Sequence, residues 1–398
     1  MKFYDSSNIP AGLVQEDFRA ALLRLNPAGG SPLFALSGIA STTQLHDIER
    51  GWWTKRSIFQ NMTVNAGGTV AAGTTALVVT AASAAEARAG LVIRHKASGN
   101  APELMLITAV AVGTNTLTVL RGFAGTTAAT IPDATVLQCI GNANEQGSLA
   151  PAPVSVLPTR YVNQTQIFRD GWDLTGTLAA IKTQVGDGTV TESKRDSMFF
   201  HGSHIERSII FGRKGVTVFN GAPMTTMAGI EQIIEDHAPG NVTEAGATTS
   251  FEQIENMLEP LLNTSVDGSL NNTRDIYCGS QALKVFNQIG KASGEYQITD
   301  GMTSFGLQFR SFKTTRGTFR LHEHAMLNSN TDWSKMAIIL DLASLELPHL
   351  RKTKHVAYGE KEQAGRDAEG GIYTTELTVE LTNPEGCGII YGLTRGVA

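Results

Sequence analysis

The sequence feature that most constrains the fold is the segment 191–212, TESKRDSMFFHGSHIERSIIFG, which is the longest clean helical pattern in the chain. Thr189 and Glu192 predict a capping box at its start, and Gly212 and Gly215 predict its end. The apolar stripe has helical spacing and consists of Met198, Gly202, Ile205 and Ile209. A helix of this length spans roughly 30 Å. Because the stripe is narrow and its flanks are polar, we expect the chain's own domain to cover only part of the helix.

Composition is that of a folded protein without a basic nucleic-acid-binding domain. Of its 398 residues 41 % are hydrophobic and 17 % charged, the formal net charge is −5, and the densest basic run is 351–355. The three cysteines, Cys139, Cys278 and Cys387, are far apart, which predicts no disulfide framework and a reducing compartment. The N-terminus has no signal-peptide pattern, and no apolar stretch is long enough to span a membrane. We therefore expect a cytosolic product.

Composition changes abruptly between residues 61 and 146, where only eight residues are charged and Ala, Gly, Thr and Val dominate. Short strand patterns recur there between turn signals, at 76–80, 91–95, 103–112, 116–121 and 134–140. Gly113-Thr114-Asn115 is a hairpin loop between two of them. The segment predicts a small all-β module inserted between segments of ordinary charge. It is either a module displayed on the surface that clasps a partner or a plain β-barrel without one.

The N-terminal 50 residues have too few apolar side chains for a core of their own. Residues 13–25, LVQEDFRAALLRL, place Phe18 on one apolar helical face, and the segment 31–38, SPLFALSG with Phe34, follows as extended chain. This region predicts an arm. The pair Trp52-Trp53 stands where the arm ends, and such aromatic residues favour an anchor in a packed interface.

The remainder of the chain has an α/β pattern. Residues 160–177 alternate as an extended strand, Ser250 and Gln253 cap a helix, and another helix opens at Ser280 and ends at Gly290. Strands are predicted at 275–278, 305–309, 318–326 and 336–340. The chain is predicted to end in a hairpin, with strands at 376–382 and 387–393 and a turn at 383–386.

The sequence offers no catalytic constellation, and we expect neither a cofactor nor a metal. His201 and His204 are three residues apart without the spacing of a zinc helix, so we expect polar contacts on an exposed helix face. His322 and His324 share one face of a strand, but Arg320 shares it too and would repel a cation. Neither a nucleophile elbow nor a phosphate-binding loop is present.

The order of these segments resembles the major capsid proteins of tailed bacteriophages, which have the Hong Kong 97-like fold. The similar segments are the arm segment SPLFALSG, YVNQTQIFRDGWDLTGT at 161–177, the helix at 192–212, TTRGTFRLHEHAML at 314–327 and TTELTVELTNPEGCGIIYGL at 374–393. The long helix is then the spine helix of that fold, a girder rather than the scaffold of an active site. Residues 61–146 depart from the minimal family plan as an insertion.

The resemblance implies an α+β fold with a fixed division of the chain. The expected parts are an N-terminal arm at 1–50, an extended-loop region at 51–170 with the inserted β module at about 61–146, a peripheral domain at 171–222 with the spine helix at 190–212, an axial domain at 223–345, and a return to the peripheral domain at 346–398 with the C-terminal hairpin. Trp52, Trp53, Phe34 and Phe18 are the candidate contacts between subunits.

The function implied is structural. Hexamers and pentamers of this chain would form an icosahedral head shell that encloses double-stranded DNA, after assembly in the host bacterial cytoplasm. A portal, a separate scaffolding protein and possibly a decoration protein are the implied partners, and no membrane is involved. Two alternatives are a carbohydrate-binding or adhesive virion surface protein that binds through the 61–146 module, and a metal-dependent hydrolase that uses the His322 and His324 face.

Overall fold

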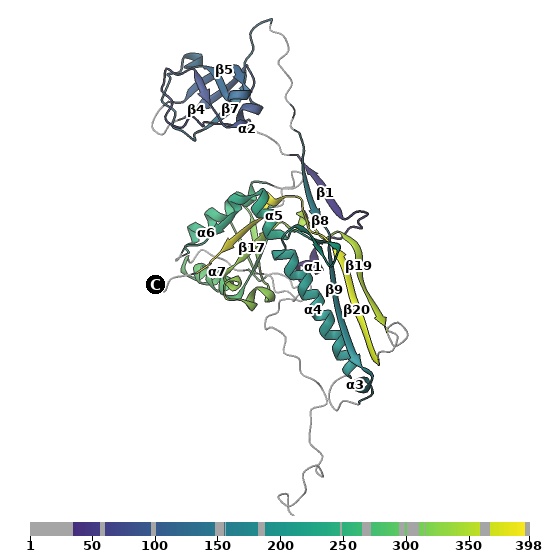
Figure 1. Ribbon diagram of the computed structural model, residues 1–398. Coiled ribbons are helices and arrows are strands. Elements are labelled where there is room, and N and C mark those ends of the chain that lie inside the picture. Colours follow the sequence, from purple (N-terminus) through teal and green to yellow (C-terminus); the bar gives the residue numbers. More distant parts are fainter. Residues whose placement is uncertain are drawn as a thin grey trace, which may run out of the picture. The chain divides into compact units, whose positions relative to one another are not determined.

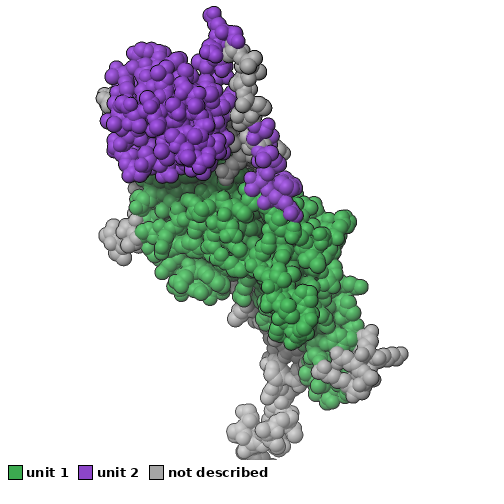
Figure 2. Space-filling view, turned by 45° about the horizontal axis from the view of Figure 1, so that its top comes forward, with its two compact units in different colours: residues 1–52, 161–398 green, residues 53–160 purple. Residues whose placement is uncertain are grey.

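The computed structural model describes most of the chain. The described residues are 35–55, 60–96, 101–147, 155, 157–181, 188–246, 249–264, 272–293, 299–300, 310–314, 316–358 and 367–394. Two compact units follow from the contacts, one of residues 1–52 and 161–398 (unit 1) and one of residues 53–160 (unit 2), which Figure 2 colours separately. The predicted helix at 13–25 with Phe18, the residue Phe34 and the predicted strand at 305–309 lie outside the described residues.

The long helix of unit 1 is α4 (Thr189–Phe211), and it ends at Gly212 as predicted. Ile205 and Ile209 are buried, but Met198 is 61 % exposed, so its assignment to the apolar stripe was wrong. The reason is that the covered face of the helix's first half is polar, with Ser197 and His201 buried instead.

The start of α4 also differs from the prediction. Gly188 is the N-cap residue and no side chain caps the helix, so the predicted capping box is wrong. Thr189 is already helical, and its hydroxyl donates to the Leu178 carbonyl at 3.4 Å, while Glu192 pairs with Arg195 at 3.2 Å. Both side chains of the predicted box therefore have other partners.

Helix α4 lies against a three-stranded antiparallel sheet in the order β19 (His349–Tyr358), β20 (Ala368–Leu377) and β9 (Gln166–Thr175). Figure 1 shows the helix running alongside β9 and β20. Strand β9 confirms the predicted extended segment: alternate residues Phe168, Trp172 and Leu174 are buried. Short α3 (Gly176–Ala180) connects toward α4, and its first turn is capped by the Thr175 hydroxyl.

A seven-stranded mixed sheet forms the second layer of unit 1. Its order is β12 (Val242–Glu244), β22 (Gly388–Tyr391), β17 (Ala337–Leu340), β13 (Thr273–Cys278), β16 (Thr318–Glu323), β15 (Arg310–Lys313) and β14 (Thr299–Asp300). Helices α5 (Ile230–His237), α6 (Phe251–Leu258) and α7 (Ser280–Ser293) accompany it. Strand β17 is buried on both faces: Ile338 and Leu340 join the core that includes α4 and α5, and Ala337 and Ile339 join the core that includes α6 and α7.

Around this sheet one predicted helix cap is confirmed and two predicted element ends need correction. The capping box of Ser250 and Gln253 is present at the start of α6. Helix α7 continues past Gly290, because one glycine costs a helix only about 1 kcal/mol and does not by itself end it. Strand β16 stops at Glu323 rather than Met326, since Ala325–Ser329 form a 3-10 turn.

The C-terminal hairpin was predicted wrongly. Strand β20 pairs with β19 and β9, whereas β22 pairs with β12 and β17 in the other sheet. Between them β21 (Glu380–Leu381) pairs with β18 (Leu345–Glu346). The predicted turn does exist, closed by the Gly386 N–H, which donates to the Asn383 side chain at 3.3 Å. The last strands therefore join the two layers instead of pairing with each other.

Unit 2 contains a closed six-stranded barrel in the order β2 (Met62–Thr63), β7 (Val136–Asn142), β4 (Leu91–His95), β5 (Glu103–Ala111), β6 (Thr116–Leu120) and β3 (Ala76–Val78). A Val64–Val79 bridge joins the two outer strands, and the Thr80 N–H donates to the Thr63 carbonyl at 2.9 Å. These strands confirm the five strand patterns and the loop ending at Asn115, where φ is +52°. Helix α2 (Ala81–Glu86) follows β3 and contacts β2.

The buried ion pair of Glu103 and Arg121 connects strand β5 with the loops of the barrel. Glu103 is fully buried and forms two hydrogen bonds with Arg121, at 2.7 and 2.8 Å, and it accepts the Ala129 N–H at 2.9 Å. Burial opposes ionisation of this carboxyl, but the Arg121 guanidinium and the Ala129 and Gly122 N–H groups hold the pKa of Glu103 below its usual range. Arg121 also donates to the Ala71 and Thr74 carbonyls, both at 3.1 Å.

Three small elements complete the described chain. Helix α1 (Ala35–Ile39) replaces the extended chain predicted for this part of the arm. Strand β1 (Glu49–Thr54) pairs with β8 (Thr159–Gln164). Strands β10 (Gly215–Phe219) and β11 (Ala222–Thr226) form a separate two-stranded hairpin after α4.

Candidate functional site

Glu206 of α4 holds α1, the first element that the structure describes. Its side chain is completely buried and accepts the backbone N–H groups of Leu36 at 2.7 Å and Ser37 at 3.0 Å. These N–H groups belong to the first turn of α1, which has no partner for them within the helix. His324 adds a third contact, with its Nε2 3.0 Å from the same carboxylate. One side chain thus joins α1, α4 and the segment after β16.

A second carboxylate lies close by in the seven-stranded sheet. Asp275 of β13 is 2 % exposed and accepts from His322 Nε2 at 2.8 Å and from Arg320 at 2.8 Å. The Tyr277 ring stacks on His322 with centroids 5.0 Å apart and meets His324 edge-on at 6.3 Å. Burial, together with Asp275 and Glu206, raises the pKa of the Tyr277 hydroxyl.

The two histidines predicted to share a face do lie together, with Arg320 beside them. Each imidazole, however, is paired with a carboxylate of its own, Asp275 for His322 and Glu206 for His324. Within the described ranges no cluster of three or more His, Cys, Asp or Glu side chains has the arrangement of a metal site. The arrangement is that of a buried polar network which fixes the packing of elements distant in sequence.

The two histidines of α4 differ in burial: His201 is buried and His204 is exposed. His204 is on the exposed face as predicted, but His201 is only 3 % exposed, so the prediction for it was wrong. Its Nδ1 is 2.7 Å from Asp170 of β9, and its Nε2 is 2.7 Å from the Thr375 hydroxyl of β20. His204 Nδ1 is 2.9 Å from the same Asp170 carboxylate. The pair ties the helix to the sheet beneath it.

Trp52 and Trp53 of β1 differ in burial, because consecutive strand residues point to opposite faces. Trp52 is 7 % exposed and stacks on Tyr161 of its own chain with centroids 6.0 Å apart. The Tyr161 ring in turn meets His237 edge-on at 4.3 Å. Trp53 is 64 % exposed. Of the four candidate contact residues, the structure describes these two, and only the Trp53 side chain is exposed.

Sequence reasoning missed the β10–β11 hairpin, which is the most exposed apolar element in the described part of unit 1. Its turn residues Asn220 and Gly221 both have positive φ, +51° and +76°. An Asn-Gly pair between strand-forming residues is the strongest short-range hairpin signal, so the sequence did carry this feature. Exposed apolar side chains also occur on α4, at Met198 and Phe200.

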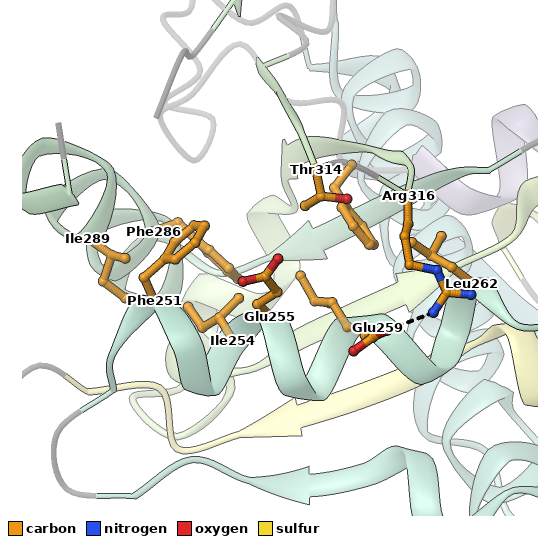
Figure 3. A pocket seen from close by; sticks show the side chains of 11 residues that line it. Phe251, Ile254, Glu255, Glu259, Leu262, Phe286, Ile289, Thr314 and Arg316 are labelled. Carbon is orange, nitrogen blue, oxygen red and sulfur yellow. Dashed lines mark hydrogen bonds and ion pairs between the residues drawn. The ribbon is translucent and has the colours of Figure 1, made fainter. Parts of the chain in front are cut away.

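A small pocket opens between α6, α7 and the β15–β16 connection. Its volume is about 110 Å³, which suits one apolar side chain. Figure 3 shows Phe251 and Ile254 of α6 and Phe286 of α7 lining it, with Arg316 paired to Glu259 at 2.8 Å at its rim. The lining contains neither histidine nor cysteine among the described residues, so it lacks an imidazole base and a thiol nucleophile.

The buried cysteines are equally unsuited to nucleophilic chemistry. Burial raises the pKa of Cys278, and it raises that of Cys387 to about 11. Both thiols are completely covered by the cores of unit 1. Among the helices that the structure describes, none is both long and apolar enough to cross a membrane.

The described residues thus combine buried polar networks, which link elements distant in sequence, with exposed apolar side chains. The family model of the SU10 major capsid protein matches residues 4–394. This chain belongs to the SU10 major capsid protein family. It is 31 % identical over 402 residues to the major capsid protein of Pseudomonas phage PaMx41, covering 97 % of this chain and 94 % of that relative.

Solved structures are similar to this chain at lower sequence identity. The capsid of a native GTA particle is similar with a TM-score of 0.50 at 8 % identity, covering 98 % of each chain. A structure of Mycobacterium phage Cain has a TM-score of 0.46 at 11 % identity, covering 94 % of this chain and 90 % of that one. The α+β, Hong Kong 97-like capsid fold expected from the sequence is therefore confirmed. The chain is a major capsid protein, a structural component of a phage virion that forms the capsid shell.

Proposed function

We propose that this capsid protein assembles as hexamers and pentamers into the icosahedral head of a tailed phage, around double-stranded DNA. The observation that carries the proposal is the anchor at Glu206. This buried carboxylate fixes the first turn of α1, the first element that the structure describes. Residues 1–50 have too few apolar side chains for a core of their own, so we propose that they act as an arm that neighbouring subunits cover.

The proposed division of labour follows the two layers of unit 1. The peripheral domain consists of α4 on the β19-β20-β9 sheet, and the axial domain consists of the seven-stranded sheet with α5, α6 and α7. Strand β22 of the C-terminal segment belongs to the axial sheet in this division. The barrel of unit 2 is the insertion in the extended loop, and a closed barrel has no open sheet edge with which to pair.

The contents and partners of the shell follow from charge and chemistry. A net charge of −5 is compatible with a capsid shell that encloses DNA without binding its phosphates tightly. The shell is assembled in the host cytoplasm with a portal, a separate scaffolding protein and possibly a decoration protein. The role is structural without catalysis, which agrees with the paired histidines and the buried thiols.

Contacts between subunits are proposed at Trp53 and, within the arm, at Phe18 and Phe34. The two adjacent tryptophans offer a matched test. Trp53→Ala removes an exposed ring and should reduce the yield of closed particles while leaving the melting temperature of the unassembled protein unchanged.

Trp52→Ala is the control, because it removes a ring buried against Tyr161 and should lower that melting temperature. Particle yield is measured by sedimentation and electron microscopy. Normal yields from Trp53→Ala would remove this residue from the assembly contacts, and a monodisperse monomer from the unaltered chain under all conditions would contradict the proposed function itself.

A further inference from the structure

The β10–β11 hairpin has an unusual composition for an exposed element. Residues 215–226 contain no charged side chain, yet every residue of β10 is exposed. Four large apolar side chains stand out: Val216 at 64 %, Val218 at 72 %, Phe219 at 63 % and Met224 at 44 % exposure. Exposed strands of soluble proteins usually carry charges that block pairing with other chains, and this one has none.

Both faces of the hairpin are apolar. The register places Val216 and Val218 on one face, with Pro223 opposite Val218. Phe219 and Met224 lie on the other face. An isolated two-stranded hairpin is marginally stable in water, so an element with two apolar faces needs a covering surface on each side.

The base of the hairpin is held rigidly. Gly212 and Gly229 approach so closely that a Cβ on Gly229 would lie 2.6 Å from the Gly212 nitrogen. The Lys214 N–H donates to the Gln232 side chain at 2.6 Å, and the Thr225 hydroxyl donates to the Thr165 carbonyl at 2.6 Å. The strands therefore project from the body in a fixed position, which is what a repeated contact requires and a loose loop does not provide.

We propose that the β10–β11 hairpin is an assembly wedge, which packs with both apolar faces between neighbouring copies of this chain in the shell. The inference rests on the proposed function and names one of its contacts.

A second copy is the occupant because the chain itself carries apolar surface that its own hairpin leaves uncovered. Met198 and Phe200 of α4 are 61 % and 56 % exposed. Met198 lies roughly 20 Å along the helix axis from Gly212, where the chain leaves α4 for the hairpin. A projecting element and an uncovered surface on one chain make a heterologous contact, which closes into rings when the rotation between copies allows it.

The test uses one substitution on each face, Val218→Asp and Met224→Asp, in the full-length chain. We expect the double variant to keep the melting temperature of the unassembled protein and to lose roughly tenfold or more of the closed particles. Val218→Thr is the matched control, because it keeps the shape and the strand preference of the side chain and should assemble nearly as well. Normal particle yield from the double Asp variant would overturn the proposal.

A photoreactive amino acid at position 219 identifies the occupant in assembled particles. A cross-linked product of twice the chain's mass supports the proposal, whereas adducts formed only with a different protein, such as a scaffold, overturn it. Failure of the unaltered chain to form particles would count against the proposed function. Normal particles with no hairpin contact would count against the wedge alone.

Discussion

Glu206→Ala removes the acceptor that three donors share inside unit 1. The Leu36 N–H and His324 Nε2 contacts are buried, and each donor left unsatisfied costs about 1–3 kcal/mol. The Ser37 N–H is only partly buried, so water recovers most of its loss. The two buried donors together give an expected destabilisation of about 2–6 kcal/mol, which is a large share of the 5–15 kcal/mol typical of a domain.

Calorimetry of the unassembled protein measures this loss, which should appear as a fall in melting temperature on the order of 10 °C. Limited proteolysis adds a local readout, since α1 loses the partner of its first turn and should be cleaved faster. Glu206→Gln keeps the shape and one acceptor oxygen, so it should fall between the parent and the alanine variant. An alanine variant that melts with the parent and protects α1 equally well would refute the assigned role of this carboxylate.

Three further predictions concern the spine helix and the barrel. Ile209→Asp places a charge at a fully buried position and should abolish soluble folding, whereas Met198→Asp at 61 % exposure should fold normally; expression and circular dichroism compare the two. Arg121→Ala leaves Glu103 buried without its cation, which should cost about 3–5 kcal/mol and speed hydrogen exchange in β5. Burial lowers the pKa of His95 below its ordinary 6.5, against the effect of Glu103. The unfolded chain therefore binds more protons below about pH 6.5, barrel stability falls as the pH drops through that range, and His95→Gln should flatten this dependence in denaturant titrations.

The elements that sequence predicted best are those whose signals are local. The capping box at Ser250 and the strand patterns of the barrel depend on neighbours a few residues away, and the structure contains them. The β10–β11 hairpin belongs to the same class, because Asn220-Gly221 specifies its turn. It was missed because no strand was predicted between Gly215, where the long helix was expected to have ended, and the helix that Ser250 caps.

The features that sequence could not give are pairings across long separations. Residues 376–381 are buried on both faces, so their alternation could not show that β20 and β22 enter different sheets. His201 is covered by Asp170 and Thr375, which come from 31 and 174 residues away. Glu206 carried no sequence signal at all, since its partners at Leu36 and His324 are brought together only by the fold.

Electron microscopy of the particles formed by this chain, expressed with the proteins of its own phage, tests the central claim most directly. The account predicts closed icosahedral shells built of hexamers and pentamers, in which density for residues 1–34 leaves the Glu206 anchor and crosses onto an adjacent subunit. Closed shells in which the arm folds back on its own subunit would contradict the assembly role of the arm, and the absence of closed shells would contradict the account as a whole.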